Sequence, residues 1–256
     1  MKIGFTERGD AGRDLSWVAK CAARQVYGAV VITKTLFDPC AQEILNLHRS
    51  GFPLILHATC TGWGGSVVEP HVWEYRKQLD AVQRLVGAGF PTKNIVLRID
   101  PIFPTGSGID RVLELINAAK AMGLIGGSSP VRLRVSVLDE YKHVKQRFTD
   151  IGFGPIYGDS FYAPDRMMAD VAMALRSTGL RFETCAETKL AAMAPDVFVP
   201  RGCLSRTDLD IMGLDYDKAF VNPQGRSGCL CLGCKTELLA RREQCPNRCA
   251  YCYWKG

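Results

Sequence analysis

Residues 29–59, AVVITKTLFDPCAQEILNLHRSGFPLILHAT, contain the pattern that decides the fold. The stretch begins and ends with short apolar runs, AVVIT from Ala29 and PLILHAT from Pro53. Runs that are apolar on both faces are typical of parallel strands covered by helices. Between them, Asp38 and Pro39 indicate the start of a helix, because proline is tolerated in a first turn. The stretch therefore predicts a strand–helix–strand unit.

The same alternation recurs along the chain. Further apolar runs are KIGF from Lys2, NIVLRI from Asn94, VRLRVSV from Val131 and RFETC from Arg181. Residues 15–26 and 72–86 have apolar side chains at helical spacing between such runs. About six or seven strand–helix units predict an α/β fold, specifically a complete or partial TIM-type (β/α) barrel. In such folds the chemistry lies where strands end and loops begin.

The domain organisation predicted is a single structural domain with two parts. Residues 1–200 form the barrel, and residues 201–256 form a cysteine-rich segment packed on it. The second part is too short to build a core of its own. A chain of 256 residues, 47% of them hydrophobic, is long enough for one sizeable core.

Charge and cysteine content exclude some classes of protein. The net charge of +6 permits a polyanionic partner without arguing for one. We find no apolar stretch of membrane-spanning length and no signal peptide, so we expect a cytoplasmic protein with no membrane partner. The eleven cysteines then favour metal binding or reduced thiols over disulfides.

The cysteines after residue 228 admit two metals. Cys231, Cys234, Cys249 and Cys252 form two C-x2-C pairs, which is close to a zinc-ribbon pattern. That alternative gives no role to Cys245, which is separated from the ligand Cys249 by three residues.

The second alternative is an iron–sulfur cluster. Cys245, Cys249 and Cys252 form C-x3-C-x2-C, with the aromatic Tyr251 just before the third cysteine. Three thiolates on one tight loop can hold three corners of a 4Fe–4S cube. The fourth iron then stays open to a ligand that is not protein, and we favour this interpretation.

The terminal motif resembles that of radical S-adenosylmethionine (SAM) enzymes. In that superfamily the open iron binds SAM, whose reductive cleavage starts hydrogen abstraction from a substrate. The motif usually follows the first barrel strand, whereas here it comes last. The resemblance therefore implies a circularly permuted barrel with the cluster loop at the C-terminus.

Three further stretches resemble the spore photoproduct lyase branch: VVITKT (30–35), LHATCTGWGGSVVEPHVW (56–73) and VLRIDPIFP (96–104). With FETCAE (182–187), a G-C, a C-x-C and the terminal motif, the chain resembles a bacterial family of unknown function that is often grouped with radical SAM proteins. It departs from that family between Cys231 and Cys245, where the segment is longer and Cys234 stands in place of a serine.

The resemblance also implies site residues, each with a simpler alternative. Lys34 would pair with the carboxylate of SAM, or lie on the surface. Thr59 and Thr61 would bind the same moiety or cap a loop, and Gly62 would let the backbone approach a ligand. Tyr251 completes the cofactor-binding set.

The remaining polar candidates belong to the substrate side and to structure. Arg98 with Asp100, and Arg8 with Asp10, follow strands and either bind a polar substrate or pair with each other. His57 is expected to be buried and hydrogen-bonded. We expect Glu69 to start the following helix.

A second, auxiliary iron–sulfur cluster is predicted from cysteines outside the terminal motif, with buried core thiols as the alternative. Its candidate ligands are Cys185, Cys203, Cys229, Cys231 and Cys234.

The function predicted is a radical SAM enzyme that abstracts hydrogen from a small-molecule or nucleic-acid substrate. Its reaction class would be lyase, isomerase or oxidoreductase, with an electron donor such as flavodoxin or ferredoxin. The alternatives are DNA-lesion repair like that of spore photoproduct lyase and a non-catalytic zinc-ribbon protein that binds nucleic acid.

Overall fold

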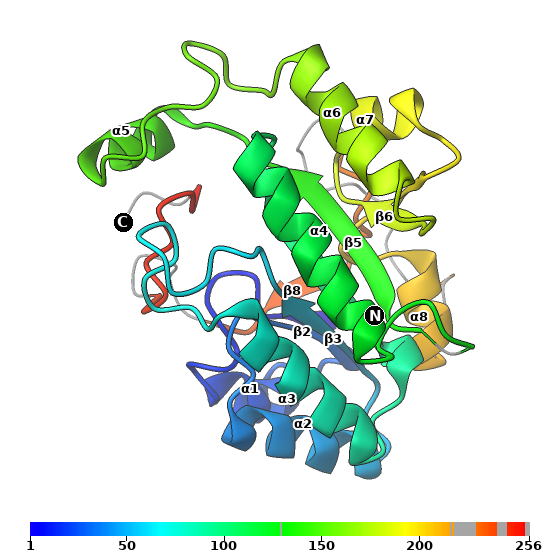
Figure 1. The fold of residues 1–256 in the computed structure, drawn as a ribbon. Helices are drawn as coiled ribbons and strands as arrows, with labels where there is room; N and C mark the ends of the chain where they lie inside the picture. Colours follow the sequence, from blue (N-terminus) through cyan, green and yellow to red (C-terminus); the bar gives the residue numbers. More distant parts are fainter. Residues whose placement is uncertain (129, 216, 218–228, 240–244, 254–256) are drawn as a thin grey trace.

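Strands and helices alternate through most of the chain (Figure 1). The computed structural model describes residues 1–128, 130–215, 217, 229–239 and 245–253. The elements in chain order are β1 (Ile3–Phe5), α1 (Ser16–Ala23), β2 (Gly28–Thr33), α2 (Asp38–Arg49), β3 (Leu54–Thr59), α3 (Tyr75–Gly87), the 3-10 helix η1 (Thr92–Asn94), β4 (Ile95–Ile102), α4 (Gly106–Ala121), β5 (Arg132–Val137), α5 (Lys142–Asp150), α6 (Asp165–Arg176), β6 (Phe182–Thr184), α7 (Thr188–Met193), β7 (Phe198–Pro200), α8 (Arg206–Met212) and β8 (Lys235–Glu237).

The strands form one eight-stranded sheet in which every pair is parallel, in the order β7-β6-β5-β4-β3-β2-β1-β8. This confirms the predicted α/β class. Within the described residues β7 and β8 are the edges and do not pair with each other. The sheet is therefore consistent with a partial or complete α/β barrel.

The last strand does not follow β7 in space but lies beside the first. Ile3 pairs with Lys235 and Phe5 with Glu237, and the Ile3 N–H donates to the Cys234 carbonyl at 2.8 Å. The apolar run KIGF therefore lies beside a strand that precedes the terminal cysteine motif in the sequence. Residues 218–228 and 240–244 of the predicted C-terminal segment lie outside the described residues.

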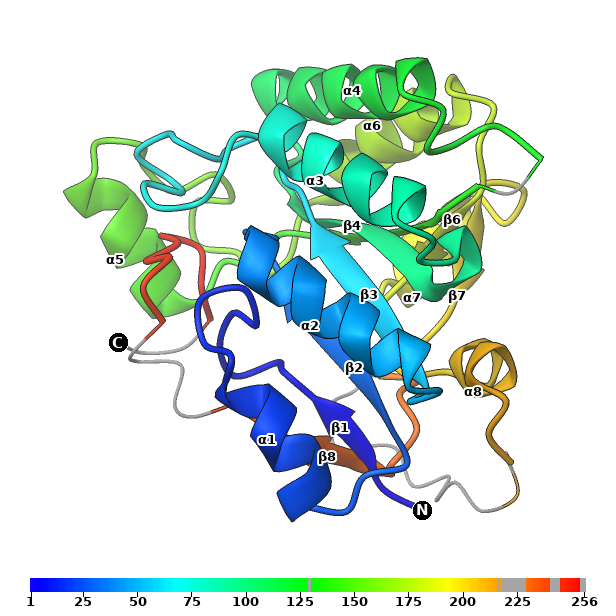
Figure 2. The same ribbon diagram turned by 90° about the horizontal axis from the view of Figure 1, so that it is seen from below.

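Two apolar cores explain why several strands are apolar on both faces. Side chains alternate along a strand, so one set packs under the surrounding helices and the other points to the opposite face. Val31, Leu56 and Leu97 belong to the helix-side core. Ile3, Val30, Ile55 and Val96 belong to the opposite core, which also contains residues from α8 and from 229–234. Figure 2 shows α1, α2 and α3 over one face and α8 away from them.

One predicted helix start is wrong. Glu69 does not begin a helix, since α3 starts six residues later at Tyr75. The intervening loop makes an isolated parallel bridge between Gly64 and Glu69, and the Gly65 N–H donates to the Glu69 carbonyl at 3.0 Å. The reason is tertiary: the Glu69 side chain is fully buried in polar contacts that a helix start would not supply.

No helix among the described residues is both long enough and apolar enough to cross a membrane.

The loop after β1 generates a stability prediction. A Cβ atom on Gly12 would stand 1.8 Å from the backbone oxygen of Thr35 and 2.6 Å from the Thr33 hydroxyl. Backbone atoms cannot move aside as easily as the end of a flexible side chain. We therefore expect Gly12→Ala to lower the free energy of unfolding by about 1–3 kcal/mol.

The matched control is Gly87→Ala in the last turn of α3, where a Cβ atom meets nothing within 4 Å. Alanine is the better helix former, so this change is expected to raise stability by up to about 1 kcal/mol. Urea denaturation measures both. Equal stability of Gly12→Ala and the parent chain would contradict the proposed close approach.

Candidate functional site

The C-terminal cysteine loop, residues 245–253, lies at the carboxyl ends of strands in the first half of the sheet and beside α5 (Figures 1 and 2). Three hydrogen bonds hold it there: Ala250 N–H to Val68 O at 2.9 Å, Asn247 Nδ2 to Asp10 Oδ2 at 2.6 Å, and Arg147 Nη1 to Cys252 O at 2.6 Å. The partners come from the loops after β3 and β1 and from α5. The last motif in the sequence thus lies at the edge of the sheet where α/β proteins carry out their chemistry.

Lys34 is the centre of a buried polar network that reaches this loop. Its Nζ donates to Glu69 Oε1 at 2.9 Å and to the Tyr251 hydroxyl at 2.5 Å. The Tyr251 hydroxyl also donates to Glu69, and the Thr61 hydroxyl donates to Glu69 Oε2 at 2.5 Å. Cys249 Sγ lies 3.9 Å from Glu69 Oε1. The sequence placed Lys34, Thr59, Thr61, Gly62 and Tyr251 in one cofactor-binding group. The structure brings Lys34, Thr61 and Tyr251 together around Glu69. Thr59 lies instead beside Arg98 on the neighbouring strand, and Gly62 contacts Arg111.

Burial and charge set the protonation of this network. Burial alone would lower the pKa of Lys34, but the Glu69 carboxylate raises that pKa well above its usual value, so the ammonium stays charged. Burial raises the pKa of the Cys249 thiol, and the Lys34 charge opposes that effect. Burial together with the neighbouring Cys249 and Glu69 raises the pKa of Tyr251. A fixed cation beside Cys249 favours its thiolate form, which is the form that binds a metal.

The terminal cysteines are spaced differently from the ligands of a single metal ion. A single tetrahedral ion with metal–sulfur bonds of about 2.3 Å holds its sulfur atoms about 3.8 Å apart. The sulfur atoms of Cys245, Cys249 and Cys252 are not all within 4.8 Å of one another. A cube with a separate iron for each thiolate needs that wider spacing. Asn247, between the first two cysteines, has a buried Oδ1 with no hydrogen-bond partner among the described residues.

A second cysteine group lies on the face of the sheet that carries the opposite core, which is called the inner face below. The ligand atoms of Cys185, Cys203 and Cys231 are all within 4.8 Å of one another, and the first two sulfur atoms are 3.0 Å apart. The Cys203 N–H donates to Cys231 Sγ at 3.1 Å. Hydrogen bonds from Cys185 and Cys203 lower the pKa of Cys231 to about 3. These three cysteines can hold a metal ion or an iron–sulfur cluster.

The structure does not bring all the predicted auxiliary ligands together. Cys229 and Cys234 are described, but neither joins the group of three. The zinc-ribbon set is not assembled within the described residues either, since Cys231 meets Cys185 and Cys203 in place of Cys234 and the terminal pair.

A row of polar side chains crosses the same inner face. Thr59 pairs with Arg98, Arg98 with Arg134, and Arg134 with Glu183, so these residues lie side by side on four strands. The Arg98 Nε donates to Asp100 Oδ2 at 2.5 Å, and the Ser136 hydroxyl donates to the other oxygen of Asp100. Arg98 and Asp100 therefore pair with each other, which was one of the two predicted alternatives. Their side chains remain 15% and 19% exposed.

Arg134 makes the connection between this row and the cysteine group. It is fully buried and donates from Nε to Glu183 Oε2 at 3.0 Å and from Nη1 to the Cys203 carbonyl at 3.2 Å. Burial alone would lower the pKa of Arg134, but the carboxylates of Asp208 and Glu183 raise it. His57 lies 3.3 Å from the same guanidinium, which confirms that it is buried and hydrogen-bonded.

Asp10 and Gly62 support the loops. Asp10 accepts hydrogen bonds from the Thr33 hydroxyl at 2.5 Å, from the Lys34 N–H at 2.8 Å and from Asn247. It therefore positions the strand end and the cysteine loop. The Gly62 carbonyl accepts from Arg111 Nη1 at 3.0 Å, and Gly62 has a φ of 82° that favours glycine. The Arg8 backbone N–H donates to Oε2 of Glu237, the last residue of β8, at 3.1 Å.

Comparison with known proteins gives a family for this arrangement. The family model described as a domain of unknown function, DUF1848, matches residues 13–254, which include both cysteine groups and the Lys34 network. The chain belongs to the DUF1848 family. No curated protein matches it. For this DUF1848 chain, the side chains themselves must therefore indicate the function.

Sequence analysis missed several residues of the site in this DUF1848 protein. Glu69 was assigned to a helix start, and Asn247 and Arg134 were given no role. Only the fold reveals their partners, because each acts across more than 30 residues of sequence. A lone carboxylate in the apolar stretch SVVEP was the one available signal for Glu69.

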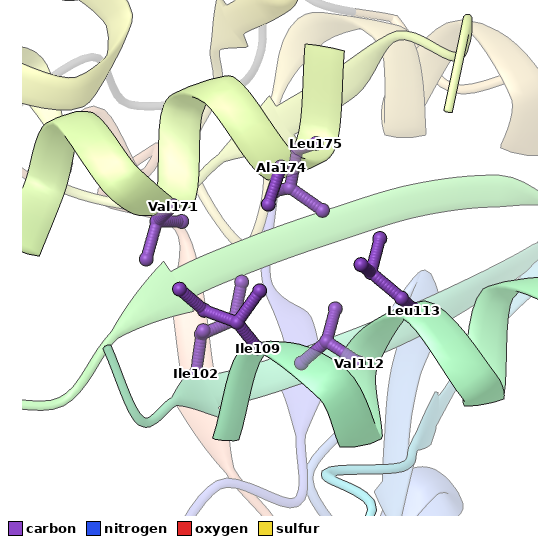
Figure 3. Close-up of a pocket in the computed structure, with 7 residues that line it drawn as sticks. All are labelled: Ile102, Ile109, Val112, Leu113, Val171, Ala174 and Leu175. Carbon is purple, nitrogen blue, oxygen red and sulfur yellow. The ribbon is translucent and has the colours of Figure 1, made fainter. Parts of the chain in front are cut away.

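A gap between α4 and α6 is not part of the site (Figure 3). Its lining is entirely aliphatic: Ile102, Ile109, Val112, Leu113, Val171, Ala174 and Leu175. These side chains offer no group that could bind a polar ligand.

The Lys34–Glu69 pair generates a stability prediction. Its side chains are 18% and 1% exposed, and removing one partner of such a pair leaves an uncompensated buried charge. We expect Glu69→Ala to lower the free energy of unfolding by about 3–5 kcal/mol. The pKa of Lys34 is higher in the folded state than in the unfolded state. The stabilisation by the Lys34–Glu69 pair is therefore present in full at pH values below the unfolded-state lysine pKa of about 10.4, and it declines as the pH rises above that value.

The control is Asp38→Ala, which breaks the exposed pair with Arg84 and should cost less than about 1 kcal/mol. Urea denaturation at several pH values measures both. A Glu69→Ala loss no larger than that of the control would show that the buried pair does not stabilise the fold.

Proposed function

We propose that this protein is a radical SAM enzyme whose catalytic 4Fe–4S cluster is held by Cys245, Cys249 and Cys252. The observation that carries the proposal is the contact between the cysteine loop and the buried network of Lys34, Glu69 and Tyr251. A thiolate trio alone can serve electron transfer or structure. Three thiolates next to a fixed cation and a fixed carboxylate are suited to binding a zwitterionic amino-acid group, which carries one charge of each sign.

The sheet order supports a circular permutation. We infer that β8 takes the place of the strand that usually precedes the cluster loop, because it lies at the sheet edge beside β1 and leads to Cys245. Opening the barrel elsewhere leaves that neighbourhood unchanged, since only the point at which the chain is cut differs.

The chain's own residues would bind and orient the cofactor. A three-thiolate 4Fe–4S cluster supplies the electron that cleaves SAM and starts hydrogen abstraction. The Lys34 ammonium is placed to bind a carboxylate, and Glu69 to accept hydrogen bonds from an amino group. Tyr251 holds both side chains in position through its hydroxyl group, while Asp10 and Asn247 fix the loop.

Arg98 and Asp100 would face the substrate. They lie on β4 on the inner face of the sheet, and Asp100 is near enough to Lys34 to interact with its charge. The proposed substrate is a small molecule or a nucleic acid, and the electron donor a ferredoxin or flavodoxin. Cys185, Cys203 and Cys231 form a second metal-capable site on the same face.

The first test is the metal content and the SAM chemistry. We expect the anaerobically prepared chain to be brown and to hold about four iron atoms in the site of the terminal motif. With a reductant and SAM it should form 5′-deoxyadenosine. Replacing Cys245, Cys249 and Cys252 together by Ala should abolish both that iron and the product.

Cys21→Ala, which changes a buried thiol in α1, is the control and should retain both. The proposal is wrong if the triple variant keeps the iron and product of the parent chain, or if the reconstituted parent chain does not cleave SAM.

The second test concerns Lys34. A charge-assisted hydrogen bond contributes roughly 1.5–3 kcal/mol, so Lys34→Ala should weaken SAM binding by about one to two orders of magnitude. Isothermal titration calorimetry measures the affinity, and iron analysis of each variant gives the fraction of chains that carry the cluster. Lys20→Ala on the exposed side of α1 is the matched control. Equal affinities for the two variants would remove Lys34 from the cofactor site.

A further inference from the structure

The three inner cysteines come from distant parts of the chain. Cys185 follows β6, Cys203 follows β7, and Cys231 precedes β8. We propose that they bind a single thiophilic divalent ion of the zinc type, whose fourth coordination position is left for a small thiol that also carries a carboxylate. The ion site is independent of the proposed SAM chemistry, whereas the role of this thiol as the substrate rests on that function.

The sulfur spacing distinguishes one ion from a cluster. A tetrahedral ion with bonds of about 2.3 Å separates its sulfur ligands by about 3.8 Å. The sulfur atoms of Cys185 and Cys203 are 3.0 Å apart and all three lie within 4.8 Å of one another, a compact spacing that a single ion can bridge. In an iron–sulfur cube each thiolate binds a separate corner, which separates the sulfur atoms more widely. Among the described residues the terminal cysteines do not form a group within 4.8 Å, unlike these three.

Two simpler explanations account for less. A disulfide between Cys185 and Cys203 would bring their sulfur atoms to about 2.05 Å and would leave the third sulfur unexplained. Buried apolar thiols need no polar partner, yet Cys231 Sγ accepts the N–H of Cys203 at 3.1 Å. Such a hydrogen bond favours the thiolate, which is the metal-binding form.

The surrounding charges suit three thiolates on a divalent ion, which carry one net negative charge. Arg98, Arg134 and Lys235 all interact electrostatically with sulfur atoms of the group. Arg134 also fixes the backbone at Cys203 through its carbonyl. Three cationic side chains, each of which also pairs with a carboxylate, are therefore close enough to act on the proposed centre.

The fourth position is not filled by the protein. In the described parts of the chain no fourth Cys, His, Asp or Glu joins the group within 4.8 Å. Two nearby carboxylates are already occupied, because Glu183 and Asp208 both pair with Arg132 and Arg134. A site with three protein ligands and one open position is the arrangement that metal ions use for exchangeable ligands.

The strand register shows what lies next to this position. The Cys185 N–H donates to the Val135 carbonyl at 3.2 Å, and Val135 pairs with Thr184, so Cys185 stands level with Ser136. Ser136 in turn contacts Asp100, the partner of Arg98. Cys185 itself is only half-buried.

Arg98 defines the second half of the ligand. Arg98 Nε donates a hydrogen bond to Asp100, and Nη2 contacts the same carboxylate. The remaining N–H groups of the Arg98 guanidinium can therefore bind a ligand. A soft metal centre prefers a sulfur ligand, and a guanidinium prefers a carboxylate. A thiol binding as thiolate would release its proton to solvent.

The first experiment is metal analysis of the full-length chain and its variants. We expect about one zinc ion per chain. This zinc should remain when Cys245, Cys249 and Cys252 are all replaced by Ala, and that variant should contain no acid-labile sulfide. Cys185→Ala, Cys203→Ala and Cys231→Ala should each lose it, while Cys229→Ala and Cys234→Ala keep it. Cys185→His, which retains a metal ligand, should keep the ion if loss in the alanine variant reflects ligation and not unfolding.

The second experiment tests the open position in the cobalt-substituted triple variant. Adding 3-mercaptopropionate should shift the cobalt absorption bands, and Arg98→Met should weaken this binding at least about tenfold. The neutral analogue 2-mercaptoethanol should bind both forms equally, which makes it the matched control ligand.

Several results would overturn the proposal: iron with sulfide retained in the triple variant, loss of zinc on Cys229→Ala, or cobalt bands unaffected by either thiol. Failure of SAM cleavage would leave the zinc content unchanged, so the two proposals fail separately.

Discussion

The ion pair between Lys34 and Glu69 is the interaction on which the site depends. Lys34 stands at the end of β2, Glu69 lies in the loop after β3, and Tyr251 of the cysteine loop contacts both. A buried charge must be balanced, so neither side chain can leave without a large penalty. The pair therefore fixes three segments that no regular hydrogen-bond ladder connects. It also explains why the loop after β3 continues past Glu69 without forming a helix, since the carboxylate is held by the sheet and the cysteine loop.

The parallel sheet supplies a second constraint, because alternation along each strand sends charged side chains to one face. Arg98, Arg134 and Glu183 are neighbours for that reason alone. Two adjacent guanidinium groups would repel each other, and each is balanced by its own carboxylate, Asp100 for the first and Glu183 for the second. The same alternation brings Cys185 to that face, so a metal-capable group and a polar row share one surface.

Local patterns predicted the strands well, since runs that are apolar on both faces leave few alternatives. They also singled out Lys34 and the terminal cysteines as candidates, because a strand end and a short motif are both visible in sequence. Glu69 and Asn247 were not predictable in this way, as their partners lie 35 and 237 residues away. The auxiliary ligand set shows the same limit: spacing offered five cysteines, and only packing separated Cys185, Cys203 and Cys231 from the other two.

The position of β8 beside β1 has a consequence for biosynthesis. Domains fold as units while the ribosome extends the chain from its N-terminus. Until β8 emerges, β1 presents an unpaired strand edge, which is the part of a sheet most open to wrong partners. Cys231, β8 and the cysteine loop are synthesised after all the other strands of the sheet. Both cysteine groups are therefore completed only after the other strands of the sheet, so a metal that either group binds cannot guide the pairing of those earlier strands.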